Sequence, residues 1–175
     1  MRINHFFIRL AGLPLIIILT FWGALLAHSA PEPQSKQFSQ EQIEQILAPI
    51  ALYPDSLLTQ VLMASTYPLE IVQADRWVKQ NKDKKGDALA KALEAQNWDP
   101  SVKSLVNFPQ VLAMMSEKLD WTQKLGDVFL AQQKDVMNTV QKLRAKAQAS
   151  GNLKTTKEQV VKVEKEVIII EPASP

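Results

Sequence analysis

Prolines divide the middle of the chain into short segments, and they constrain its fold more than any other feature. Pro54, Pro68, Pro100 and Pro109 each precede residues whose apolar side chains recur at three- and four-residue spacing. Proline cannot continue a helix, but it suits a first helical position, where its missing N–H needs no partner. These positions therefore predict that short helices begin at or near each of the four prolines.

Residues 39–152 are predicted to form an all-α domain, a compact bundle of six or seven short helices. Ser39 and Gln42 have the spacing of a capping box, which favours a helix start at Ser39. The last helix is predicted over residues 121–150, with Gly126 marking a kink or a break. The apolar positions expected to face the core are Ile43, Ile46, Leu47, Leu57, Leu58, Val61, Leu62, Leu69, Ile71, Val72, Ala74, Trp77, Trp121, Leu125, Val128, Phe129, Val136, Val140, Leu143 and Ala147.

One pattern occurs twice along the predicted helical domain. Residues 53–57, Tyr-Pro-Asp-Ser-Leu, resemble residues 98–102, Trp-Asp-Pro-Ser-Val, and an aromatic–proline pair follows each stretch. An ancient duplication of a helix pair would explain the resemblance. The simpler interpretation is that two short helices begin with similar residues for the same physical reason.

The first residues have the layout of a secretory signal peptide. A basic start and an apolar run precede Ala27 and Ser29, which place small residues at the −3 and −1 positions of a signal-peptidase site. Cleavage before Ala30 would remove residues 1–29 and leave residues 30–38 as a flexible leader. The alternative is an uncleaved anchor in the inner membrane, since the apolar run is near the lower limit for spanning a bilayer.

Residues 153–175 differ in composition and are predicted to be a β-prone tail. Seven valine and isoleucine residues concentrate between residues 160 and 170, and Pro172 ends the run. One strand with no evident partner would be open to pairing. The tail is therefore a candidate for strand addition to a partner protein.

Seven stretches of the chain carry a resemblance to a known family. They are LAPIALYPDSLL at 47–58, VLMASTYPLE at 61–70, ADRW at 74–77, WDPSVK at 98–103, DWT at 120–122, RAKA at 144–147 and GNL at 151–153. With these stretches, residues 40–171 resemble the bacterial exported family called domain of unknown function 3300. The resemblance implies export and a helical region, and it implies no assigned activity. Family members usually continue into Tyr/Pro-rich strands and a low-complexity tail beyond the end of this chain.

The sequence predicts no catalytic residue, no cofactor site and no metal site. The chain has no cysteine, and His5 and His28 both lie in the expected signal peptide, so the mature chain would contain neither residue type. No nucleotide-binding or serine-hydrolase motif occurs. No acidic loop of the EF-hand type supports a calcium site.

A pair of carboxylates could still act as in glycoside hydrolases. The candidates are Asp55, Glu70, Asp75 and Asp99. Asp55 and Glu70 fall in first helical turns, where they favour the helix dipole, and Asp99 suits a helix N-cap. A carboxylate-based cell-wall hydrolase is therefore kept as an alternative function.

Four residues, Arg76, Trp77, Trp98 and Asp99, are the candidate partner-binding positions. Aromatic side chains can line a groove for a peptide or a sugar, although on amphipathic helices they more often belong to the core. The lysines of residues 79–85 could contact an anionic partner, or they could form a solvated loop, since two aspartates interrupt the run.

The favoured function is a non-enzymatic interaction module of the cell envelope, periplasmic or secreted. Its expected partner is an unknown envelope protein or a cell-wall polymer. Nucleic acid is not expected, because Arg2 and Arg9 account for the formal net charge of +2. A membrane contact is expected only through residues 1–29, if they are not cleaved. A truncated remnant of a longer relative is a third interpretation.

Overall fold

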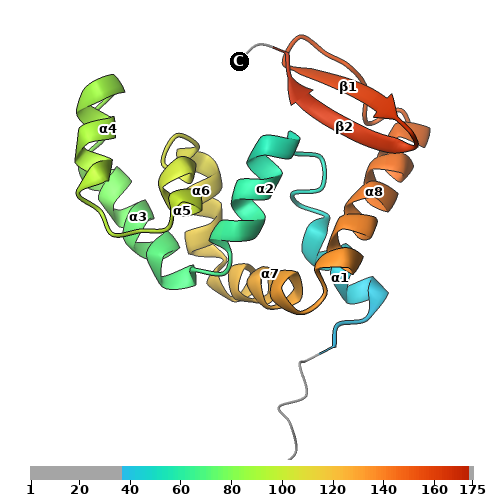
Figure 1. The fold of residues 1–175 in the computed structure, drawn as a ribbon, viewed down its shortest axis with the longest axis horizontal. Helices are drawn as coiled ribbons and strands as arrows, with labels where there is room; N and C mark the ends of the chain where they lie inside the picture. Colours follow the sequence, from blue (N-terminus) through green and yellow to red (C-terminus); the bar gives the residue numbers. More distant parts are fainter. Residues whose placement is uncertain (1–36, 174–175) are drawn as a thin grey trace, which may run out of the picture. The chain divides into compact units, whose positions relative to one another are not determined.

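The computed structural model describes residues 37–173, which belong to one unit spanning residues 34–175. In this described part, eight helices are followed by two strands (Figure 1). The elements are α1 (Gln40–Leu47), α2 (Asp55–Ala64), α3 (Pro68–Gln80), α4 (Gly86–Glu94), α5 (Pro100–Leu105), α6 (Pro109–Glu117), α7 (Leu119–Ala131), α8 (Gln133–Ala149), β1 (Gln159–Glu164) and β2 (Val167–Pro172).

The prediction of a mainly helical fold is confirmed, but the described residues form eight helices instead of six or seven. The long helix predicted over residues 121–150 is two helices, α7 and α8, which meet at Gln132 and not at Gly126. The side-chain amide of Gln132 accepts from the Phe38 N–H at 2.6 Å and donates to the Phe38 carbonyl at 3.2 Å. These bonds join the junction of α7 and α8 to the segment before α1 and satisfy the backbone groups of Phe38.

The helix starts follow the predicted chemistry. Ser39 Oγ accepts from the Gln42 N–H, and the Gln42 side chain accepts from the Ser39 N–H, so the capping box is confirmed. Asp99 caps α5 by accepting from the Ser101 N–H at 2.8 Å. A proline occupies the first turn of α3, α5 and α6.

Two helix pairs, α2–α3 and α5–α6, turn through the same backbone corner. The dihedral angles are φ −121° and ψ 58° at Tyr67, and φ −123° and ψ 64° at Phe108. Each of these residues donates its N–H to the carbonyl three positions earlier and accepts from the N–H four positions later. We call the two turns corner one (residues 64–71) and corner two (residues 105–112).

The two helix pairs also pack against each other in matching order. Helix α2 lies against α5, and α3 lies against α6. A side chain from the equivalent position in each corner bonds the equivalent carbonyl: Thr66 donates to Met63, and Asn107 donates to Ser104. The two pairs are therefore structural repeats, whichever of the two origins produced them.

The core receives buried aliphatic side chains from every helix of the described residues except α4. The expected core positions are buried or partly buried except Leu69, which is 72% exposed in the first turn of α3. Leu89 and Leu93 of α4 are only partly buried against it. The core therefore holds α4 least firmly, because hydrophobic stabilisation scales with the apolar area removed from water.

Helix α7 crosses corner one at Gly126. A Cβ added to Gly126 would lie 2.4 Å from the Ser65 carbonyl oxygen and 3.2 Å from the Thr66 Cα. These distances are too short for any side chain, so the glycine permits close approach of two backbones. Its role is packing. The predicted break at this residue is wrong, because α7 continues through it from Leu119 to Ala131.

The C-terminal segment is a hairpin, and the expectation of one strand with no evident partner is wrong. Strand β1 pairs antiparallel with β2, with Glu164 opposite Val167. The two residues of the turn, Lys165 and Glu166, have φ of 48° and 71°, as the tightest hairpin turns require. Strand β2 lies against α2 and α8, and Ile168 and Ile170 are buried there together with Leu153.

The expected signal peptide over residues 1–29, and the leader up to residue 36, lie outside the described residues. Between residues 37 and 173, no helix combines the length and the apolar character needed to cross a bilayer.

Candidate functional site

Three of the four candidate residues lie together between α3 and the start of α5. The rings of Trp77 and Trp98 pack edge to face, with 5.9 Å between their centroids and 85° between their planes. The Trp98 Nε1–H donates to Gln73 Oε1 at 3.1 Å, and both rings are partly buried against the core. The Arg76 side chain is exposed and forms no hydrogen bond or ion pair with another described residue. The structure therefore groups Trp77, Trp98 and Asp99 and leaves Arg76 apart.

Asp99 is held by several hydrogen bonds. Its carboxylate accepts from the N–H and the hydroxyl of Ser101, and its own N–H donates to Glu70 Oε2 at 2.7 Å. Burial raises the pKa of Asp99, but hydrogen bonds from Ser101 and Tyr67 lower it, and the resulting pKa lies below the ordinary value. The charge of Asp99 is in turn the main cause that raises the pKa of Tyr67. Asp99 is thus ionised at neutral pH, which does not suit a general acid.

The other carboxylates considered for catalysis have structural partners of their own. Asp55 forms an ion pair with Arg144, and Asp75 forms one with Lys79 at 2.8 Å. Glu70 accepts the backbone N–H described above. Among the described residues, no three acidic side chains gather where they could hold a metal ion. This geometry gives the hydrolase alternative no support.

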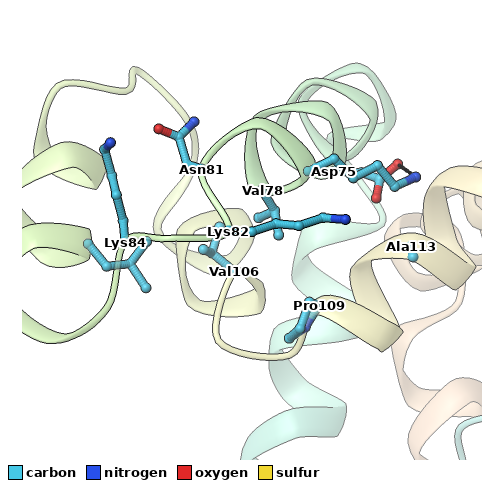
Figure 2. A pocket seen from close by; sticks show the side chains of 10 residues that line it. Asp75, Val78, Asn81, Lys82, Lys84, Val106, Pro109 and Ala113 are labelled. Carbon is cyan, nitrogen blue, oxygen red and sulfur yellow. Dashed lines mark hydrogen bonds and ion pairs between the residues drawn. The ribbon is translucent and has the colours of Figure 1, made fainter.

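A groove of about 420 Å³ opens between α3, α4 and α6. Figure 2 shows its lining, with Val78 and Asp75 on α3 and with Pro109 and Ala113 on the facing helix α6. The apolar side chains of the lining come from four segments of the chain: Val78, Leu89, Val106, Pro109 and Ala113. The groove therefore joins corner two to the C-terminal end of α3.

Lysines give one rim of this groove a positive charge. Asp75 neutralises Lys79, whereas Lys82 and Lys84 form no ion pair with any described residue. The loop that carries them is fixed, because the Asn81 side chain donates to the α3 backbone at 2.8 Å and the Lys84 N–H donates to the Asn81 carbonyl at 3.0 Å. Two unpaired cations thus lie beside an apolar surface, an arrangement that suits an acidic amphipathic partner.

Arg144 is a buried residue that sequence reasoning did not single out. Its side chain is 1% exposed, and it donates to the carbonyls of Ala51, Tyr53 and Ile168 at 2.8–3.0 Å. The ion pair with Asp55 completes the set. A signal was present, since Arg144 stands four residues after Val140 and eight after Val136, in the apolar stripe of α8. A charge in that stripe has to be paired when the helix is buried.

A family model described as "Protein of unknown function (DUF3300)" matches residues 39–175. The uncharacterized protein YacH of Escherichia coli (strain K12) is 55% identical over 131 residues, which cover 75% of this chain and 21% of YacH. The chain thus spans about a fifth of the length of that relative. No solved structure matches.

Proposed function

The chain belongs to the DUF3300 family of proteins of unknown function, and we propose that it is an exported, non-enzymatic interaction module of the cell envelope. The partner binds in the groove between α3, α4 and α6. The observation that carries this proposal is the position of two unpaired lysines, Lys82 and Lys84, beside an apolar lining.

The groove favours a protein partner over a cell-wall polymer. Half of the residues that line it are apolar, and the other half, which include Lys82 and Lys84, are polar or charged. A polysaccharide needs polar partners for its hydroxyl groups, whereas a protein can present apolar and acidic side chains together. An apolar side chain of the partner would complement the apolar lining, and acidic residues around it would complement the lysine rim.

Binding can be tested with a matched pair of charge reversals. Poly-L-glutamate serves as an acidic polypeptide, and purified peptidoglycan serves as the cell-wall polymer. The double variant Lys82→Glu/Lys84→Glu is expected to lose binding to poly-L-glutamate. The variant Lys124→Glu/Lys142→Glu changes two exposed lysines on α7 and α8 by the same charge and is expected to bind normally. Equal binding by both variants, or binding to peptidoglycan alone, would contradict the proposal.

Export is supported by the sequence of residues 1–29 and is tested separately. The protein is recovered from the envelope fraction of cells that express the full chain, and its N-terminal residue is determined. Ala30 is the expected first residue, since small residues precede it at −3 and −1. Recovery from the cytoplasm with an intact N-terminus would rule out export.

A further inference from the structure

The structural repeat gives the groove a counterpart elsewhere in the same molecule. Corner one and corner two share their dihedral angles and their hydrogen bonds, so that Ser65 corresponds to Val106 and Pro68 corresponds to Pro109. Val106 and Pro109 line the groove at corner two. The packing of the chain against corner one therefore indicates what kind of structure fits against corner two.

At corner one, the cover is a helix of the chain itself. Helix α7 contacts α2, α3 and α6, and its Gly126 lies directly on the Ser65 carbonyl. Gln123, Asp127 and Leu130 line the same surface hollow beside Ser65 and Pro68. On this face of α7, Gly126 is followed directly by Asp127, and Gln123 and Leu130 lie about one turn away on either side.

At corner two, no helix of the described residues takes the equivalent place. Helix α4 follows α3 as α7 follows α6, so it is the counterpart of α7 in chain order. It has no buried residue, and Leu89 is its one side chain in the lining of the groove. The groove is the volume that a more closely packed helix would fill.

We propose that corner two receives an amphipathic helix of a partner protein, seated on Val106 and Pro109 as α7 is seated on corner one. The partner helix carries a small residue where it crosses the corner. One acidic residue follows it directly and another lies one turn before it, next to Lys82 and Lys84. The apolar side of that helix covers Val78, Leu89 and Ala113. This inference rests on the proposed function and names the kind of partner.

The probe is a peptide that copies α7, residues 119–131, with the change Gln123→Glu. The change places a second carboxylate beside Gly126, in addition to Asp127, on the face that covers corner one. Nuclear magnetic resonance of the labelled protein locates the binding surface, and titration gives the affinity. Amide shifts are expected between Val78 and Lys84 and in corner two.

Three variants test whether the peptide binds at corner two in the way proposed. In the protein, Lys82→Glu/Lys84→Glu should weaken binding of the peptide about tenfold or more, because two attractive contacts become repulsive, whereas Lys124→Glu/Lys142→Glu should not. In the peptide, the further change Gly126→Leu should abolish binding, because a side chain would prevent close approach to the backbone. Circular dichroism of each protein variant establishes that the helices are intact.

The outcomes separate this inference from the function on which it rests. If the peptide does not bind, or binds equally well with Gly126→Leu, while poly-L-glutamate still needs the two lysines, the helix-seating inference is overturned and the proposed function stands. Shifts confined to another surface would overturn it as well. If neither probe needs Lys82 and Lys84, both proposals are contradicted.

Discussion

The guanidinium group of Arg144 on α8 donates a hydrogen bond to the backbone carbonyl of Ile168 on β2, with 2.8 Å between nitrogen and oxygen. Gln141, one turn earlier, bonds both the N–H and the carbonyl of Ile168. Those backbone groups therefore point away from β1 and toward α8. Side chains of α8 thus take the place that a third strand would have taken at this edge of the hairpin.

Replacement of Arg144 by methionine should destabilise the protein severely. The change would leave the carbonyls of Ala51, Tyr53 and Ile168 without their buried donor and Asp55 without its cation. A buried carbonyl that loses its donor costs about 1–3 kcal/mol. The loss of the ion pair adds less, because the Asp55 side chain is 45% exposed. Urea denaturation measures the change in free energy of unfolding.

The matched control is Lys142→Met, which changes an exposed residue of the same helix. It should alter stability by no more than about 0.5 kcal/mol. An Arg144→Met protein as stable as this control would contradict the role of Arg144 as the link between α8, the loop after α1 and the hairpin.

Gly126→Ala should destabilise the protein, although alanine is normally the better helix former by about 0.5–1 kcal/mol. The new Cβ would collide with the Ser65 carbonyl and force α7 away from α2. Overpacking of this kind costs about 1–3 kcal/mol. Thermal unfolding checks the sign, with Asp127→Ala at the next, exposed position of α7 as the control. A melting temperature raised by Gly126→Ala would show that the two helices do not approach so closely.

The local rules of helix formation made much of the helical part predictable. Ser39 and Asp99 were recognisable as caps, and the prolines of α3, α5 and α6 fell in first turns. The break at Gln132 was not predictable, because no glycine or proline stands there and its side chain bonds Phe38, 94 positions away. Tertiary contacts decide such details, and no local pattern encodes them.

The hairpin and the groove were missed for different reasons. The turn at Lys165 and Glu166 contains no glycine or asparagine, the residues by which such turns are normally recognised. The groove is assembled from α3, α4, corner two and α6, which only the fold brings together. The lysines beside it were noted in the sequence, but their apolar neighbours could not be.

Asp99 should make the stability of the protein depend on pH in the acid range. Its pKa in the folded protein lies below the ordinary value of 3.8, so its contribution is complete above that value and is lost as the pH falls through the folded pKa. Asp99→Asn keeps a good N-cap and removes the charge. The difference in free energy of unfolding between this variant and the wild type should be larger at pH 7 than at about pH 3.

One outcome of this pH comparison would contradict the prediction. A difference that is unchanged between the two pH values would show that the charge of Asp99 does not act through Ser101 and Tyr67. Asp127→Asn, which removes an exposed carboxylate on α7, controls for the general effect of acid on the protein.

Trp98→Ala and Arg76→Ala should behave differently. Trp98 packs edge to face on Trp77, bonds Gln73 and is partly buried, so its removal should cost about 2 kcal/mol. The Arg76 side chain is exposed and forms no hydrogen bond or ion pair with a described residue, so its removal should change stability by at most about 0.5 kcal/mol. Urea denaturation of both variants provides the comparison, and equal losses would contradict it.

A partner is proposed to bind in the groove between α3, α4 and α6. The most direct test places a photo-crosslinking amino acid at Ala113, in the lining of the groove, and irradiates living cells. If a partner binds there, one crosslinked adduct with another protein is expected. It should disappear with Lys82→Glu/Lys84→Glu and persist with Lys124→Glu/Lys142→Glu. The same adduct should be absent when the crosslinker replaces the exposed Asn138 of α8. If no adduct forms from Ala113, or if the adduct also forms with Lys82→Glu/Lys84→Glu, the proposed binding in the groove is contradicted.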